Sequence, residues 1–126
     1  MIRRCFVIAL LAACWSNQAG AESEPLSIEV CQRAQSGVFY KNCLGELLEL
    51  EEDRLAYALA AARQEISRDE VARQFDAAQN EWAGFLSEEC AFAFAKVAPG
   101  SDASAAETRC RILLIRDRIR YLAEDY

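Results

Sequence analysis

Four cysteines constrain the fold of this chain more than any other feature. Cys31, Cys43, Cys90 and Cys110 lie beyond an apolar N-terminal segment, at spacings of 12, 47 and 20 residues, and the chain contains no histidine. An even number of cysteines in a small domain outside the cytoplasm indicates disulfide bonds. Zinc is the weaker alternative, because these are not zinc-ribbon spacings and four thiolates would have to escape oxidation. We therefore expect disulfides, and no cofactor or metal.

The N-terminal segment has the pattern of a secretory signal peptide. Residues 1–4 are a basic start, residues 5–15 are an apolar run, and residues 16–21 are small or polar. The run is too short to cross a bilayer. We expect cleavage after Ala21 and a periplasmic or secreted location. The apolar run also contains a lipobox pattern before Cys14, so a lipid anchor in the cell envelope is the alternative.

Export would leave a single acidic domain. Removal of 21 of the 126 residues would leave 105, and it would take away two of the 14 basic residues and none of the 20 acidic ones, so the net charge would change from −6 to −8. Such a length supports one modest core, and disulfides commonly stabilise exported domains of this size. A surface of this charge repels phosphates, which argues against nucleic-acid binding.

Residues 28–126 are predicted to form an all-α domain, preceded by a flexible leader at residues 22–27. A short helix over residues 28–36 carries Cys31, and Gly37 marks a break before the first long helix. No strand-like alternation competes with the helical periodicity. The expected fold is a small disulfide-stapled bundle of three main helices plus the short N-terminal helix.

Apolar residues at steps of three and four identify the three main helices. The first extends from Val38 to about Ile66, the second from Ser67 to a stop at residues 99–101, and the third from Ser104 onward. The apolar faces comprise Cys43, Leu44, Leu47, Leu48, Leu55, Ala58, Leu59 and Ala62; Val71, Phe75, Ala78, Trp82 and Phe85; and Ile112, Ile115, Ile119 and Leu122. We expect these faces to form the core.

Capping signatures mark the starts of the second and third long helices. Ser67 is followed by Glu70, and Ser104 by Glu107. At this spacing a hydroxyl and a carboxylate satisfy the free amides of a first turn. Both pairs therefore predict capping boxes.

Disulfide geometry requires the chain to reverse direction between paired cysteines. The two Cα atoms must lie within about 7 Å, whereas unbroken helix would separate Cys31 from Cys43 by roughly 18 Å and Cys90 from Cys110 by about 30 Å. The break before the first long helix and the stop after the second supply such reversals. Four cysteines allow three connectivities, and spacing alone does not select among them. Each local loop would contribute about 3 kcal/mol of stability.

Residues of the second and third long helices resemble the signature of a known family. They are Gln79, Trp82, Phe85 and Cys90, then Gly100 and Ser101, then Cys110 and Arg118. Together with the early cysteine pair, and over about residues 28–122, they resemble the LprI-type lysozyme-inhibitor N-terminal domain family. The resemblance implies a small exported helical domain with Cys31 bonded to Cys43 and Cys90 bonded to Cys110. It also implies lysozyme inhibition.

Structural roles compete with binding roles at the signature residues. Trp82 and Phe85 lie on the apolar stripe, which favours core packing over ligand contact. Gln79 lies one turn before Trp82 and is expected to hydrogen-bond a loop backbone. Arg118 is expected to pair with a carboxylate of a neighbouring helix or with a helix C-terminus, and ligand binding is the alternative.

The charges are unevenly distributed along the chain. Acidic residues gather in the first long helix, and five arginines crowd the third. Pairing between these helices is one interpretation of the acidic cluster, which consists of Glu46, Glu49, Glu51, Glu52 and Asp53. The other is a contact surface for a basic partner, formed by Glu46, Glu49, Glu52 and Asp53. An acidic protein attracts basic partners, and animal-type lysozymes are strongly basic.

No arrangement of residues indicates catalysis. The chain lacks the histidine of imidazole-dependent triads and has no phosphate-binding glycine loop. Carboxylates at helical spacing are more typical of a solvated face than of a glycosidase.

We therefore predict a non-enzymatic protein that binds and inhibits a basic lysozyme-type partner in the cell envelope. The acidic surface and the loop at residues 96–104 are the two candidate contact regions. The alternative is an envelope binding or assembly module with an unrelated protein partner and no inhibitory activity. No transmembrane segment is expected in the mature chain, and the sequence specifies no oligomeric state.

Overall fold

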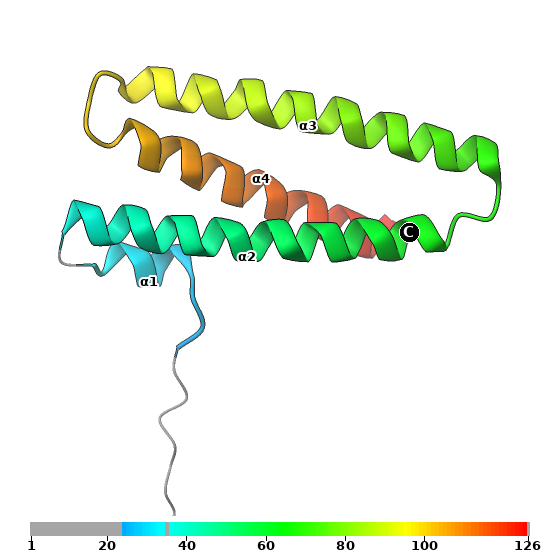
Figure 1. The fold of residues 1–126 in the computed structure, drawn as a ribbon, viewed down its shortest axis with the longest axis horizontal. Coiled ribbons are helices and arrows are strands. Elements are labelled where there is room, and N and C mark those ends of the chain that lie inside the picture. The colour runs from blue at the N-terminus through cyan, green and yellow to red at the C-terminus, as the bar shows by residue number, and fades with distance from the viewer. Residues whose placement is uncertain (1–23, 35, 126) are drawn as a thin grey trace, which may run out of the picture.

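The computed structural model describes residues 24–34 and 36–125, and these residues form four helices and no strand (Figure 1). In chain order the helices are α1 (Ile28–Gln32), α2 (Gly37–Gln64), α3 (Asp69–Val97) and α4 (Ala103–Asp125). The prediction of an all-α fold with one short and three long helices is confirmed. The predicted signal peptide and the cysteine of the predicted lipobox lie outside the described residues.

The C-terminal helix occupies the middle of the bundle. α4 packs along both α2 and α3, and α1 packs against α2. Figure 1 shows α4 between the other two long helices, with α1 beside the N-terminal end of α2. Consecutive long helices therefore run in opposite directions, joined by the short turns at residues 65–68 and 98–102.

Serine residues cap the first two helices. The Val30 amide donates to Ser27 Oγ at 3.1 Å, and the Phe39 amide donates to Ser36 Oγ at 3.3 Å. Gly37 is consequently the first residue of α2 and not the break, and the short helix ends at Gln32, before the predicted Ser36. Ser27 belongs to the segment expected to be a flexible leader, whose described part, residues 24–27, is not helical.

The predicted capping box at the start of α3 is wrong. The N-cap residue is Arg68, one position after Ser67, and its side chain makes no capping hydrogen bond. The Ala72 amide donates to the Arg68 carbonyl at 3.0 Å, which sets the first turn. Carboxylates of Asp69 and Glu70 lie in this turn, where the helix dipole favours negative charge.

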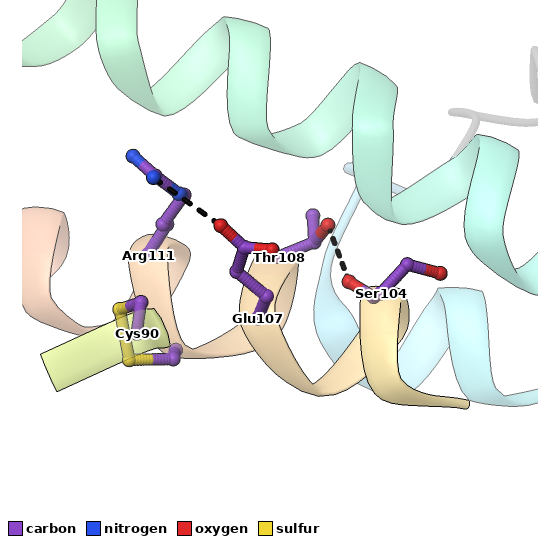
Figure 2. The surroundings of a disulfide bond; sticks show 6 residues. Cys90, Ser104, Glu107, Thr108 and Arg111 are labelled. Atoms are coloured by element: carbon purple, nitrogen blue, oxygen red, sulfur yellow. Dashed lines mark hydrogen bonds and ion pairs between the residues drawn. A yellow bond between two sulfur atoms is a disulfide. The ribbon is translucent and has the colours of Figure 1, made fainter. Parts of the chain in front are cut away.

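The predicted capping box at the start of α4 is also wrong. The helix begins at Ala103, so Ser104 is already inside the first turn. Its carbonyl accepts a hydrogen bond from the Thr108 hydroxyl at 2.9 Å, whereas Glu107 binds Arg111 at 3.3 Å (Figure 2). The Glu107 side chain therefore bonds forward along the helix, and the Ser104 hydroxyl makes no capping hydrogen bond in the part of the chain described.

Two disulfides fasten the bundle. Cys31 is bonded to Cys43 with the Cα atoms 5.4 Å apart, and this bond joins α1 to α2. Cys90 is bonded to Cys110 with the Cα atoms 5.5 Å apart, and this bond joins α3 to α4 (Figure 2). These are the pairings that the family resemblance implied. Each bond spans a reversal of the chain, as the geometric argument required.

The core has two parts along the length of α4. The part beside α1 contains Ile28, Cys31, Leu44, Leu47, Ala105 and Ile112. The part toward the other end contains Leu55, Ala62, Phe75, Leu86, Ile115 and Leu122. Complete burial of one large aliphatic or aromatic side chain contributes about 1.5–3 kcal/mol, so these clusters supply most of the driving force for folding.

The buried face of α3 differs from the predicted stripe at several positions. Phe85 is 52% exposed and Ala78 is also exposed, whereas Leu86 is 7% exposed. The prediction that Phe85 packs in the core is therefore wrong. Leu86 lies one turn before the buried Cys90, so the disulfide and the four-residue step select Leu86 for the interior.

Candidate functional site

Three signature residues meet between α3 and α4. Arg118 Nε donates a hydrogen bond to Gln79 Oε1 at 3.1 Å. The same guanidinium lies 5.8 Å from the centroid of the Trp82 ring and 5.4 Å from that of Tyr121. The predicted partners of Arg118 and of Gln79 are therefore wrong. Arg118 binds an amide oxygen and two aromatic rings instead of a carboxylate, and Gln79 accepts from this side chain instead of bonding a loop backbone.

This cluster joins α3 to α4 at the edge of their contact. Gln79, Trp82 and Arg118 are all half-buried. A hydrogen bond to a charged group contributes about 1.5–3 kcal/mol, and a guanidinium over an aromatic face adds about 0.5–1 kcal/mol. These contacts assign the signature residues Gln79, Trp82 and Arg118 a structural role, which is to hold α3 against α4.

Two further signature residues, Gly100 and Ser101, shape the turn between α3 and α4. A Cβ atom at Gly100 would approach the Val97 carbonyl oxygen to 2.8 Å, which is too close for any other residue without displacement of the turn. The Gly100 amide donates to that same oxygen at 2.9 Å. The Ser101 carbonyl accepts a hydrogen bond from Lys41 Nζ, so α2 holds the turn in place.

Glu51 is buried, which the sequence interpretation did not anticipate. Its side chain is 2% exposed and binds Arg116 of α4 at 2.9 Å and Arg54 at 3.2 Å. A signal was present, since Glu51 lies four residues after Leu47 and four before Leu55, on the apolar face of α2. The Glu51–Arg116 contact confirms pairing between helices for this one acidic residue.

The other acidic residues of this run remain at the surface. Glu46, Glu49, Glu52 and Asp53, here called the acidic face of α2, are all exposed. None of them forms an ion pair with another residue in the described part of the chain. Steps of three and four residues place Glu46, Glu49 and Asp53 in one row along the helix. The structure thus leaves four carboxylates available to a partner.

A shallow apolar groove lies between the C-terminal halves of α2 and α4. Its volume is about 320 Å³. The groove is lined by Tyr57, Ala58, Ala61, Ala62, Glu65, Ile119, Leu122 and Ala123. Tyr57 stands at its border with 80% of its surface exposed. We call this feature the α2–α4 groove.

The Glu29 carboxyl group has a lowered pKa. A backbone hydrogen bond at the N-terminus of α1 lowers the pKa of Glu29, with smaller effects from the Ser27 hydroxyl and from the charges of Arg116 and Arg109.

Residues 24–34 and 36–125 contain no group of His, Cys, Asp or Glu able to hold a metal ion. Over the same residues, no helix is both long enough and apolar enough to span a bilayer.

The fold and these contacts define a small disulfide-bonded helical domain with an acidic outer face. The chain belongs to the LprI lysozyme-inhibitor family, because the family model described as lysozyme inhibitor LprI matches residues 30–122. This match covers all four helices except the first two and last three of their residues, and it confirms the resemblance found in the sequence. The chain matches no curated protein and no solved structure.

Proposed function

We propose that this protein is an exported, non-enzymatic inhibitor that binds a basic lysozyme-type protein in the cell envelope. The observation that carries the proposal is the family match, which extends over the whole four-cysteine domain. The two disulfides support export, because such bonds persist in oxidising compartments.

The acidic face of α2 is the proposed contact surface. Its four carboxylates are exposed, and the net charge of the whole chain is −6. A surface of this sign attracts a cationic protein over long range and increases the rate of association. The proposal therefore predicts binding that weakens as salt is added, since added ions screen exposed charges.

A second candidate function is an envelope binding or assembly module with a different protein partner. Gln79, Trp82, Gly100 and Arg118 are engaged in contacts within the fold. These family residues thus specify the scaffold, and a different target is compatible with the same scaffold.

An inhibition assay separates the two candidates. The oxidised protein is added in micromolar excess to an animal-type and to a bacterial muramidase, and lysis of cell walls is followed at low and at high salt. We expect slower lysis by the basic enzyme, with a smaller effect at high salt. Lysis at the uninhibited rate by both enzymes at low salt would exclude inhibition and favour the second candidate.

Charge reversal tests the surface. We expect Glu46→Lys combined with Asp53→Lys to weaken inhibition strongly. The matched control is Glu81→Lys with Glu88→Lys, which makes the same change of charge at exposed positions of α3. Equal loss in both double variants would assign the effect to net charge and not to the acidic face.

The N-terminus of the mature protein distinguishes a free domain from a lipid-anchored one. We propose cleavage after Ala21 with release of a free domain, because the residues before this position are small. Intact-mass measurement of the exported protein gives the site directly. A diacylglycerol adduct on Cys14 would show a lipid anchor instead.

A further inference from the structure

We propose that the α2–α4 groove receives a lysine or arginine side chain of the basic partner. This inference rests on the proposed function and adds to it a specific anchoring site. The acidic face of α2 would attract the partner, and the groove would hold one of its cationic side chains.

The groove has the shape and lining that a long cationic side chain requires. Its floor consists of small and aliphatic residues, among them Ala58, Ala61 and Ile119. Lysine and arginine carry several methylene groups, which pack on apolar surface while the charged end stays near solvent. A volume of about 320 Å³ lies at the lower end of the range for small-ligand sites. One side chain with its flanking backbone fits this space.

Two groups at the border suit the charged end of such a side chain. Tyr57 is 80% exposed, so its ring is accessible to a cation on the groove side. The Glu65 side chain lines the groove, is exposed, and forms no ion pair with another described residue. An aromatic face and a carboxylate thus lie at the border of one apolar trough.

The ends of both helices favour positive charge at this place. α2 ends at Gln64 and α4 at Asp125, and Figure 1 shows these two C-termini at the same end of the bundle. Helix C-termini carry partial negative charge, and their last turn favours cations. The last turn of α4 contains no basic residue, and Arg63 of α2 is bound to Asp76 at 3.2 Å. The charge of the site is therefore complementary to a cationic side chain supplied from outside.

The test uses variants that fill the groove or remove its border. Ala61 is exposed, so Ala61→Leu narrows the groove without disturbing the core. Ala77→Leu is the matched control, because Ala77 is exposed on α3 and lines none of the grooves described. Tyr57→Ala removes the ring, and Tyr57→Phe keeps it. Binding of each oxidised variant to a basic animal-type lysozyme is measured by surface plasmon resonance.

We expect Ala61→Leu and Tyr57→Ala to weaken binding roughly tenfold, through faster dissociation. Tyr57→Phe and Ala77→Leu should bind like the wild type. Glu65→Gln should weaken binding about threefold at low salt and less at high salt. Acetylation of the lysozyme's lysines should abolish the difference between wild type and Ala61→Leu if the anchor is a lysine, and leave it if the anchor is an arginine.

Three other results would overturn the proposal that the α2–α4 groove binds a cationic side chain. If the wild type binds and Ala61→Leu binds equally well, the groove is not used although the proposed function stands. If the wild type fails to bind any lysozyme, both the function and the groove inference fall. If Ala61→Leu abolishes self-association of the protein and leaves lysozyme binding unchanged, the occupant is a second copy of this chain.

Discussion

α4 packs against α2 on one side and against α3 on the other, and different interactions cross the two contacts. Between α3 and α4 there is the Cys90–Cys110 disulfide together with Arg118, which binds Gln79. Between α2 and α4, the described residues contain no disulfide, and Arg116 binds the buried Glu51. Arg116 and Arg118 are two residues apart, so the helix turns them about 200° apart, toward different neighbours.

The two contacts also differ in the distance along the chain that they close. Cys90 and Cys110 are 20 residues apart, whereas Glu51 and Arg116 are 65 apart. The α3–α4 contact is therefore local and covalently closed. The α2–α4 contact is long-range and depends on burial and on one ion pair, so its stability should respond more strongly to single side-chain changes.

The largest expected effect is loss of the covalent bond between α3 and α4. Replacement of both Cys90 and Cys110 by serine should lower the free energy of unfolding by about 3 kcal/mol, because the unfolded chain regains its freedom. Urea unfolding of the oxidised wild type and the double variant measures this. The same replacement at Cys31 and Cys43 is the comparison. An unchanged urea midpoint in the variant without Cys90 and Cys110 would show that this disulfide adds no stability to the α3–α4 contact.

Removal of the Arg116 side chain from the α2–α4 contact should lower the free energy of unfolding by nearly as much. Arg116→Ala leaves Glu51 buried with only Arg54 beside it, and breaking a buried pair from one side costs about 3 kcal/mol. Arg120→Ala is the control, because its pair with Asp117 is exposed and should contribute less than about 1 kcal/mol. Thermal unfolding of both variants gives the comparison. Equal shifts would mean that burial of Glu51 has no energetic consequence.

A smaller loss is expected at the corresponding arginine of the α3–α4 contact. Arg118→Ala removes a hydrogen bond and two ring contacts, but it leaves a neutral amide behind, so about 1–2 kcal/mol should be lost. Arg118→Lys should restore little, because an ammonium lacks the planar guanidinium. A loss larger than that of Arg116→Ala would reverse the comparison between the two contacts.

The smallest effect concerns α1 and acidic pH. The pKa of Glu29 lies below its ordinary value of 4.5, so the carboxylate form is favoured in the folded state. This contribution is present above about pH 4.5 and is lost as the pH falls through the lowered pKa. NMR titration of the Glu29 carboxyl, with amide exchange of α1, measures the change. Glu29→Gln should abolish the pH dependence, and an unshifted titration would contradict the assigned cause.

Patterns that depend on long stretches of sequence predicted the fold well. The spacing of the apolar residues predicted three long helices, and the four cysteines required the reversals that the structure contains between α1 and α2 and between α3 and α4. The family match confirms the resemblance that implied both disulfides. The domain boundaries and the contact surface stay predictions.

Patterns that depend on single positions were less reliable. Ser67 and Ser104 fit capping boxes, but the helices begin at neighbouring residues because the turns set the first backbone hydrogen bonds. Phe85 and Leu86 are adjacent and both apolar, so only the position of Cys90 against α4 decides which of them is buried. Likewise, helical periodicity places Glu51 on the apolar face of α2, but it does not reveal the arginine 65 residues away that pairs with it there.

The central place of α4 has a consequence for the order of assembly. α4 makes the main contacts of both α2 and α3, so the apolar surfaces that these two helices bury lie largely against a helix that follows them in the chain. A polypeptide that crosses a membrane N-terminus first would carry both earlier helices through before their shared packing partner arrives. The native core of such a polypeptide could close only once α4 has followed, so α2 and α3 would remain unpacked until then.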